Sequence, residues 1–228
     1  MNSGTQRAHA VSTLRVGGLT PLTTIDFPGQ LAAVVYCQGC PWRCRYCHNG
    51  HLLKEEKAAA DWASTLAFLE RRRGLLDAVV FSGGEPTAQS ALPDAIEDVR
   101  TLGFRIGLHT GGAYPARLKQ VLPLVDWVGL DIKALPEDYP ALTGVVGSGE
   151  HAWESLAVLQ AAGLPFDVRV TVHDALLPAP RLAQLLERLR DGGVAEPVLQ
   201  ACRSEHMLDP SLGPTARDQG WGSLGQSR

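Results

Sequence analysis

The sequence lacks the features of several classes of protein. Only 6% of its 228 residues are aromatic, and five cysteines are too few, and odd in number, for a disulfide framework. Lys and Arg number 21 against 24 Asp and Glu, without long blocks of one sign, which argues against a nucleic-acid or polybasic membrane binder. No apolar run approaches the ~20 residues of a membrane span, and residues 1–14 contain no signal-peptide core. We therefore expect a cytoplasmic protein that binds neither nucleic acid nor membrane.

What the sequence does contain is an alternation of short apolar runs with helical patterns. The expected strands are residues 31–36, 78–81, 105–108, 127–132, 167–172 and 197–199. The first two are apolar throughout, which is typical of parallel strands covered on both faces. Helical spacing follows most of them, as in Leu182, Leu185 and Leu189 ahead of a capping Gly192. About six βα units predict an α/β fold, namely a partial (β/α)6 barrel of parallel strands in a single domain.

The two ends of the chain are rich in Ser, Gly, Gln and charge and show little apolar periodicity. We therefore expect a disordered N-terminal arm over residues 1–14 and a disordered C-terminal tail over 209–228. The ordered domain is expected to span residues 15–208. Because a partial barrel leaves one side uncovered, we expect a macromolecular partner to dock there.

Four of the five cysteines lie in the segment Cys37-Gln-Gly-Cys40-Pro-Trp-Arg-Cys44-Arg-Tyr-Cys47. A structural zinc site usually draws on two separated C-x₂-C pairs, and a bacterial ferredoxin site reads C-x₂-C-x₂-C-x₃-C-P. Neither pattern is present. A third interpretation takes Cys40, Cys44 and Cys47 as three ligands of a four-iron cubane, which leaves one iron open to a substrate. On this interpretation Cys37 is a small buried hydrophobe and Cys202 is a bystander.

The C-x₃-C-x₂-C spacing, with aromatic Tyr46 before the last cysteine, resembles the signature of the radical S-adenosylmethionine enzymes. The wider stretches 19–29 and 38–49 resemble the glycyl-radical-enzyme activating proteins, of the anaerobic ribonucleoside-triphosphate reductase type, and the resemblance covers roughly residues 15–200. It implies an anaerobic oxidoreductase in which one three-cysteine 4Fe–4S cluster reductively cleaves S-adenosylmethionine. It also implies a glycyl radical enzyme as protein substrate and a flavodoxin or ferredoxin-type electron donor.

Further candidate residues follow the predicted strands directly, where parallel α/β proteins place their sites. The resemblance implies that the Gly83-Gly84-Glu85 turn holds the methionine amino group, that Asp131 and Lys133 lie beside the cofactor and that His173 lies near its ribose. The remaining implied cofactor contacts are Tyr46, Cys47, His48, Thr110 and Ile132. Each has a plainer alternative: Gly-Gly-Glu-Pro also makes an ordinary turn, Asp and Lys also form surface pairs, and a lone histidine is often structural.

His109 departs from the family pattern. Members such as the pyruvate formate-lyase activating enzyme have an aspartate there that helps to hold a monovalent cation, and an imidazole cannot supply that hard anionic oxygen. The sequence therefore argues against a cation site.

Two other functions remain open. One is a radical enzyme that acts on a small molecule, similar to 7-carboxy-7-deazaguanine synthase, and the other is a non-catalytic zinc-binding interaction module.

Overall fold

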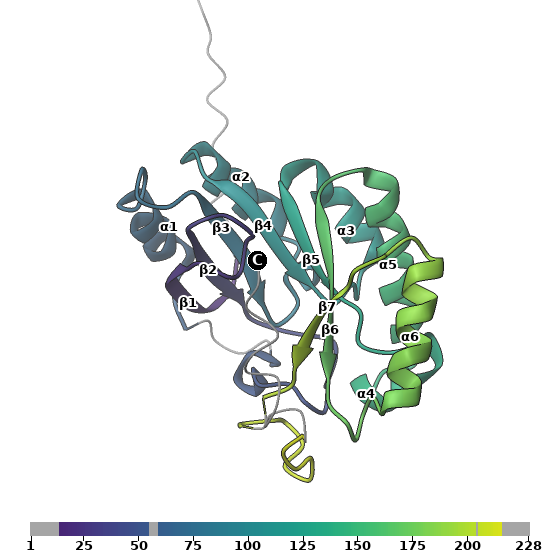
Figure 1. Cartoon of the computed structure of the whole chain (residues 1–228). Helices are drawn as coiled ribbons and strands as arrows, with labels where there is room; N and C mark the ends of the chain where they lie inside the picture. Colours follow the sequence, from purple (N-terminus) through teal and green to yellow (C-terminus); the bar gives the residue numbers. More distant parts are fainter. Residues whose placement is uncertain (1–13, 55–58, 204, 216–228) are drawn as a thin grey trace, which may run out of the picture.

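The computed structural model describes residues 14–54, 59–203 and 205–215, and its centre is one seven-stranded sheet (Figure 1). The strands lie side by side in the order of the sequence. They are β1 (Val16–Thr23), β2 (Ala32–Cys37), β3 (Ala78–Gly83), β4 (Arg105–Thr110), β5 (Trp127–Asp131), β6 (Phe166–Val172) and β7 (Val198–Ala201). β2 to β7 are parallel, and β1 pairs with β2 antiparallel. The predicted open, parallel α/β sheet is confirmed, with all six expected strands within two residues of their predicted ends.

β1 was not predicted, because its sequence carries two glycines and a proline, which usually mark turns. The structure gives Gly17 a packing reason: a Cβ there would lie 2.2 Å from the side chain of Leu52. Local sequence preference therefore gives way to tertiary packing at this edge.

In the described part of the chain, six α-helices pack around the outside of the curved sheet (Figure 1). They are α1 (Trp62–Glu70), α2 (Leu92–Thr101), α3 (Pro115–Val121), α4 (Tyr139–Thr143), α5 (Ser148–Ala162) and α6 (Ala179–Asp191). Short 3₁₀ turns lie in the connections between strands and helices: η1 (Gly50–Leu52), η2 (Pro86–Ala88), η3 (Leu122–Leu124) and η4 (Pro136–Asp138). The predicted cap of α6 is confirmed, since the amide of Gly192 donates to the carbonyl of Arg188. No helix within the described ranges is long and apolar enough to cross a membrane.

The inner face of the sheet is apolar near the starts of the parallel strands and polar near their carboxyl ends. Near the strand starts, Phe27 from the β1–β2 hairpin stacks on Trp127 with ring centres 5.3 Å apart, and both belong to a small apolar cluster with Val80. Side chains alternate along a strand, so the residue two positions beyond Val80 is Ser82 on the same face. By the same alternation Asp131, four residues after Trp127, lies on the same face and at the carboxyl end of β5. Polar groups therefore gather at the carboxyl ends of the strands.

Both expected domain boundaries need correction where the structure describes them. Leu14 is buried in the main core, so order begins before residue 15. Residues 209–215 are not disordered: Leu212 and Thr215 are buried and Asp209 pairs with Arg45. Backbone hydrogen bonds, the Arg45–Asp209 ion pair and a hydrogen bond from Thr215 to Asp174 hold this segment, and such contacts leave no apolar periodicity in the sequence. Residues 1–13 and 216–228 lie outside the described residues.

Candidate functional site

The cysteine loop, residues 38–49, follows β2 and carries Cys40, Cys44 and Cys47 as free thiols. Its backbone is anchored to η1, where the amide of Gly39 donates to the carbonyl of Leu52 at 2.7 Å. Cys44 is buried, whereas Cys40 and Cys47 are partly exposed. The loop therefore holds its three thiols at the carboxyl end of the sheet.

The other two cysteines, Cys37 and Cys202, lie outside this loop. Cys37 is fully buried in the core at the end of β2, as expected of a small hydrophobe. Cys202 is also buried, with its sulfur 3.8 Å from the sulfur of Met207. The division into three ligands and two bystanders stays a prediction.

The donor set fits an iron–sulfur cubane. Burial raises the pKa of Cys40 to about 12 and also raises the pKa of Cys44, so both are thiols until a metal displaces their protons. Within the described residues, no three Cys, His, Asp or Glu side chains converge on a point that could hold one metal ion. A cubane does not need such convergence, because each thiolate binds a different iron. The loop could hold a 4Fe–4S cluster through Cys40, Cys44 and Cys47.

The Gly83-Gly84-Glu85 turn packs directly against the start of this loop. The amide of Gly84 donates to the carbonyl of Cys37 at 2.9 Å, and the amide of Glu85 donates to the carbonyl of Gly39 at 2.8 Å. A Cβ on Gly84 would lie 2.2 Å from the Gly39 oxygen, and Gly83 has φ +105°. The glycines are thus required by the close approach of two loops. The predicted contact of this turn with a ligand stays a prediction.

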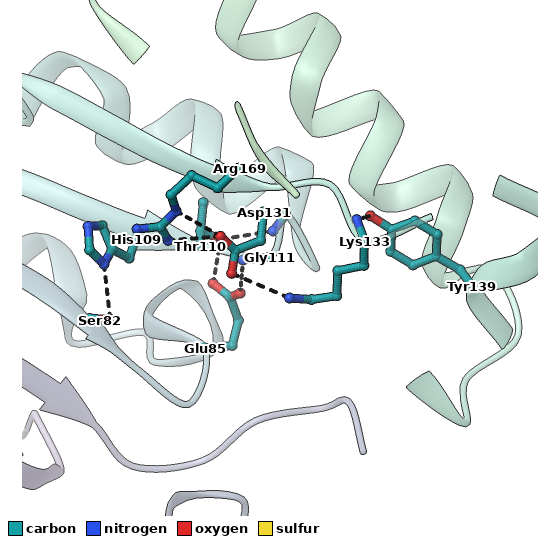
Figure 2. Close-up of polar contacts among 10 residues, drawn as sticks. Ser82, Glu85, His109, Thr110, Gly111, Asp131, Lys133, Tyr139 and Arg169 are labelled. Atoms are coloured by element: carbon teal, nitrogen blue, oxygen red, sulfur yellow. Dashed lines mark hydrogen bonds and ion pairs between the residues drawn. The ribbon is translucent and has the colours of Figure 1, made fainter. Parts of the chain in front are cut away.

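The Glu85 carboxylate is 2% exposed and fully engaged with neighbouring turns (Figure 2). Its Oε1 accepts from the amide of Thr87 and from the hydroxyls of Thr87 and Thr110, and its Oε2 accepts from the amide of Gly111. Burial raises the pKa of Glu85, and these hydrogen bonds oppose that rise. Glu85 and Thr110, both predicted as cofactor contacts, are therefore bonded to each other and fix the ends of β3 and β4.

Asp131 lies between two cations (Figure 2). Its Oδ1 accepts from the Nε and Nη2 of Arg169 at 2.9 and 2.8 Å, and its Oδ2 lies 3.3 Å from the Nζ of Lys133. Burial opposes ionisation of Asp131, but Arg169 and then Lys133 lower its pKa to about 2. Sequence reasoning missed Arg169. The alternation of buried valines with polar residues along β6 could have placed it on the inner face.

Lys133 brings its positive charge to the cysteine loop. Its Nζ lies 5.7 Å from the ring centre of Tyr46, and its amide donates to the hydroxyl of Tyr139 at 2.8 Å. The Tyr46 hydroxyl is buried with no hydrogen-bond partner among the described residues. Burial works against the charge of Lys133, but Tyr46 and Asp131 hold its pKa well above the usual value. The ammonium is thus a fixed charge beside the loop.

His109 is a neutral histidine in this arrangement. Its Nε2–H donates to the carbonyl of Asp26 at 2.8 Å, so its Nδ1 accepts from the hydroxyl of Ser82 at 3.3 Å. Burial, and then the charge of Arg169, lowers the pKa of His109 to about 4. The position therefore supplies no anionic oxygen, and Arg169 already neutralises the nearby Asp131.

Among the other predicted cofactor contacts, the rings of His173 and His48 hydrogen-bond to the chain itself, and Ile132 is buried. The ring of His173 donates from Nε2 to the carbonyl of Gly213 at 3.0 Å and accepts at Nδ1 from the amide of Ala175, and its place near the cofactor's ribose stays a prediction. Ile132 is fully buried in the core, and its cofactor contact stays a prediction. His48 donates from Nε2 to a carbonyl after β7, and its cofactor contact stays a prediction.

Comparison with known proteins agrees with this geometry. The family model of the Radical SAM superfamily matches residues 34–195. A protein of Methanocaldococcus jannaschii with the provisional name glycyl-radical enzyme activating enzyme is 31% identical over 142 residues, 60% of this chain and 57% of its own length. The pyruvate formate-lyase-activating enzyme of Clostridium pasteurianum is 27% identical over 192 residues, 78% of each chain.

Other relatives carry a different activity in their names. An S-adenosylmethionine-dependent nucleotide dehydratase of a Thermoplasmatales archaeon is 29% identical over 58% of this chain and 49% of its own. The crystal structure of Streptococcus suis SuiB bound to S-adenosylmethionine superposes with a TM-score of 0.62 at 14% identity, over 76% of this chain and 41% of that one. This last likeness shows the fold.

The buried neutral His109 predicts a loss of stability in mild acid. An unfolded histidine binds a proton near pH 6.5 and the folded one only near pH 4, so stability falls as the pH drops between these values. We expect the free energy of unfolding to fall by about 2 kcal/mol more in the wild type than in His109→Gln between pH 7 and pH 5. Urea unfolding measures this, with His151→Gln on the exposed face of α5 as control. Equal losses in wild type and His109→Gln would contradict the assignment.

The Arg169–Asp131 pair predicts independence from alkali cations. We expect the wild type to bind S-adenosylmethionine equally well in sodium, potassium or choline chloride at equal ionic strength. Arg169→Met leaves Asp131 with Lys133 alone among the charged side chains described, so we expect its affinity to depend on the alkali cation. Isothermal titration calorimetry measures both proteins, and a wild type that requires potassium would refute the prediction.

Proposed function

The chain belongs to the Radical SAM superfamily, and from that premise we propose that it installs a glycyl radical on a partner enzyme. The observation that carries this proposal is the match to the pyruvate formate-lyase-activating enzyme, which covers the same large share, 78%, of both chains. The archaeal relative of which the chain spans 57% bears an activating-enzyme name as well. Membership of the superfamily also removes the zinc-binding interaction module from consideration.

In this proposal Cys40, Cys44 and Cys47 hold the 4Fe–4S cluster. When bound, the cluster and S-adenosylmethionine supply the electron and the radical precursor. The chain positions the cofactor between two elements. The Gly83-Gly84 turn packs against the cysteine loop, and the ammonium of Lys133, which follows β5, lies near Tyr46 of the same loop. The ammonium of Lys133, which is paired with Asp131 in the structure, would attract a carboxylate of the bound cofactor.

The substrate side of the site is the inner face of the sheet near β6 and β7. Val198 is 44% exposed there and Gln200 is exposed, whereas the strands at the centre are covered. We propose that a glycine-bearing loop of the partner, an anaerobic ribonucleoside-triphosphate reductase or a similar glycyl radical enzyme, reaches the site from this side. A flavodoxin or ferredoxin-type protein is the proposed electron donor.

A second candidate function is radical chemistry on a small molecule. The relative named as a nucleotide dehydratase favours it, although the match covers 49% of that protein. The two candidates share the cofactor and differ in what receives the radical, so the receiver must be measured directly.

Reductive cleavage of S-adenosylmethionine tests the cluster. We expect protein reconstituted anaerobically with iron and sulfide, and reduced by dithionite, to form 5′-deoxyadenosine, because the three-thiol loop leaves one iron open. Cys44→Ala should lower product formation to background, whereas Cys202→Ala, which alters a buried bystander, should retain it. Chromatographic quantification of 5′-deoxyadenosine gives the answer, and undiminished product from Cys44→Ala would refute the ligand assignment.

Radical transfer tests the proposed function. We expect the reconstituted protein, incubated anaerobically with S-adenosylmethionine, a reductant and a purified anaerobic ribonucleoside-triphosphate reductase, to generate the doublet of a glycyl radical in electron paramagnetic resonance. A reductase in which the radical-bearing glycine is replaced by alanine should give no signal. Vigorous cofactor cleavage with no radical on the reductase or on other glycyl radical enzymes would favour the small-molecule candidate.

A further inference from the structure

The segment that follows β7 crosses to the cysteine loop, and we call residues 205–215 the C-terminal strap. In Figure 1 it is the yellow segment beyond the carboxyl ends of β6 and β7. Its amides at Leu208 and Asp209 donate to the carbonyls of Cys47 and Arg45 at 3.0 and 2.8 Å. The strap thus pairs, backbone to backbone, with the part of the loop that carries the last candidate ligand.

One side chain reinforces this pairing. The Oδ2 of Asp209 accepts from the Nε of Arg45 at 2.8 Å, and its Oδ1 accepts from the amide and hydroxyl of Ser211 at 2.9 and 2.6 Å. Asp209 therefore holds the loop with one oxygen and shapes the turn of the strap with the other. These charge-assisted bonds lower the pKa of Asp209 to about 2, so it is ionised at neutral pH.

The loop is held from its other side by α4. The amides of Arg43 and Arg45 donate to the carbonyls of Thr143 and Leu142 at 2.8 and 3.1 Å. The peptide groups around Arg45 thus bond to α4 on one side and to the strap on the other. Without the strap, the carbonyls of Arg45 and Cys47 would lose these partners.

The far end of the strap is anchored at the end of β6. Thr215 donates through its hydroxyl to Asp174 at 2.7 Å, and the carbonyl of Gly213 accepts from His173. Leu212 and Thr215 are buried. β1 and β7 are the two edges of the sheet, so the strap spans the rim between the last strands and the loop after β2.

We propose that Asp209 is a positioning residue for the cluster, which acts by holding the C-terminal strap over the Cys47 side of the cysteine loop. Hydrogen bonding around the ligands and exclusion of water set the stability and potential of an iron–sulfur cluster. The strap donates a backbone hydrogen bond to the carbonyl of the partly exposed Cys47, and in this proposal it also limits the access of water to that residue. This proposal rests on a cluster in the cysteine loop and is independent of which substrate receives the radical.

The test uses the full chain and compares Asp209→Ala and Asp209→Asn with a matched control, Asp61→Ala. Asp61 accepts from the amide and hydroxyl of Ser64 at the start of α1, so the control removes a similar Asp–Ser turn elsewhere. In the cluster-free protein we expect hydrogen exchange at the amides of Leu208 and Asp209 to quicken about tenfold in Asp209→Ala. Asp61→Ala should exchange there as the wild type does.

In the reconstituted protein we expect Asp209→Ala to release iron to a chelator several-fold faster than the wild type, with Asp209→Asn between them. We also expect the reduction potential of the cluster to be higher in Asp209→Ala than in the wild type, because water stabilises the more negative reduced cluster. If Asp209→Ala does not fold, the same comparison is made with Asp209→Asn and Ser211→Ala.

Two results would overturn the proposal. Faster amide exchange with unchanged iron release and unchanged potential would show that the strap packs on the loop without affecting the cluster. Unchanged amide exchange would show that Asp209 does not anchor the strap. Neither readout requires substrate turnover, so failure of radical transfer would not be confused with failure here.

Discussion

The buried carboxylate of Glu85 is the constraint on which the arrangement of the site depends. A buried carboxylate must find its donors nearby, and here they come from its own turn and from the turn after β4. The same turn is locked to the cysteine loop by the close approach of Gly84 to Gly39. Three loops from three different strands are thereby fixed to one another, so the thiols, the turn and the end of β4 form one rigid unit.

A second group of charges is set against this unit from β5 and β6. Asp131 neutralises much of the charge of Arg169, which lets a guanidinium sit on the inner face of the sheet. Lys133 keeps a buried ammonium beside Tyr46. The site therefore combines a thiol-rich loop on one side with fixed positive charge on the other, a combination that suits a ligand carrying a carboxylate.

Sequence patterns were sufficient for the parallel strands and the cysteine loop, because apolar runs and cysteine spacing are local signals. They failed where contacts are made by the backbone or by isolated residues. β1 was hidden by its glycines and proline, and Arg169 is a single basic residue in an otherwise ordinary strand. The strap has no apolar periodicity, and its order comes from amides that donate to distant carbonyls and from the side chains of Asp209 and Thr215. The ring of His173 donates to a carbonyl of the strap, at Gly213, a contact that the position of a histidine after a strand could not indicate.

The strand order also has a meaning for the way the protein is made. Since each strand pairs with its immediate predecessor and successor, a chain leaving the ribosome can add every new strand to the edge just completed. The cysteine loop is synthesised early in this series, but Asp209, its partner through Arg45, follows 164 residues later. The cysteine loop is therefore left without this anchor until the residues after β7 have been synthesised, so its final conformation depends on the folding of nearly all of the described sheet.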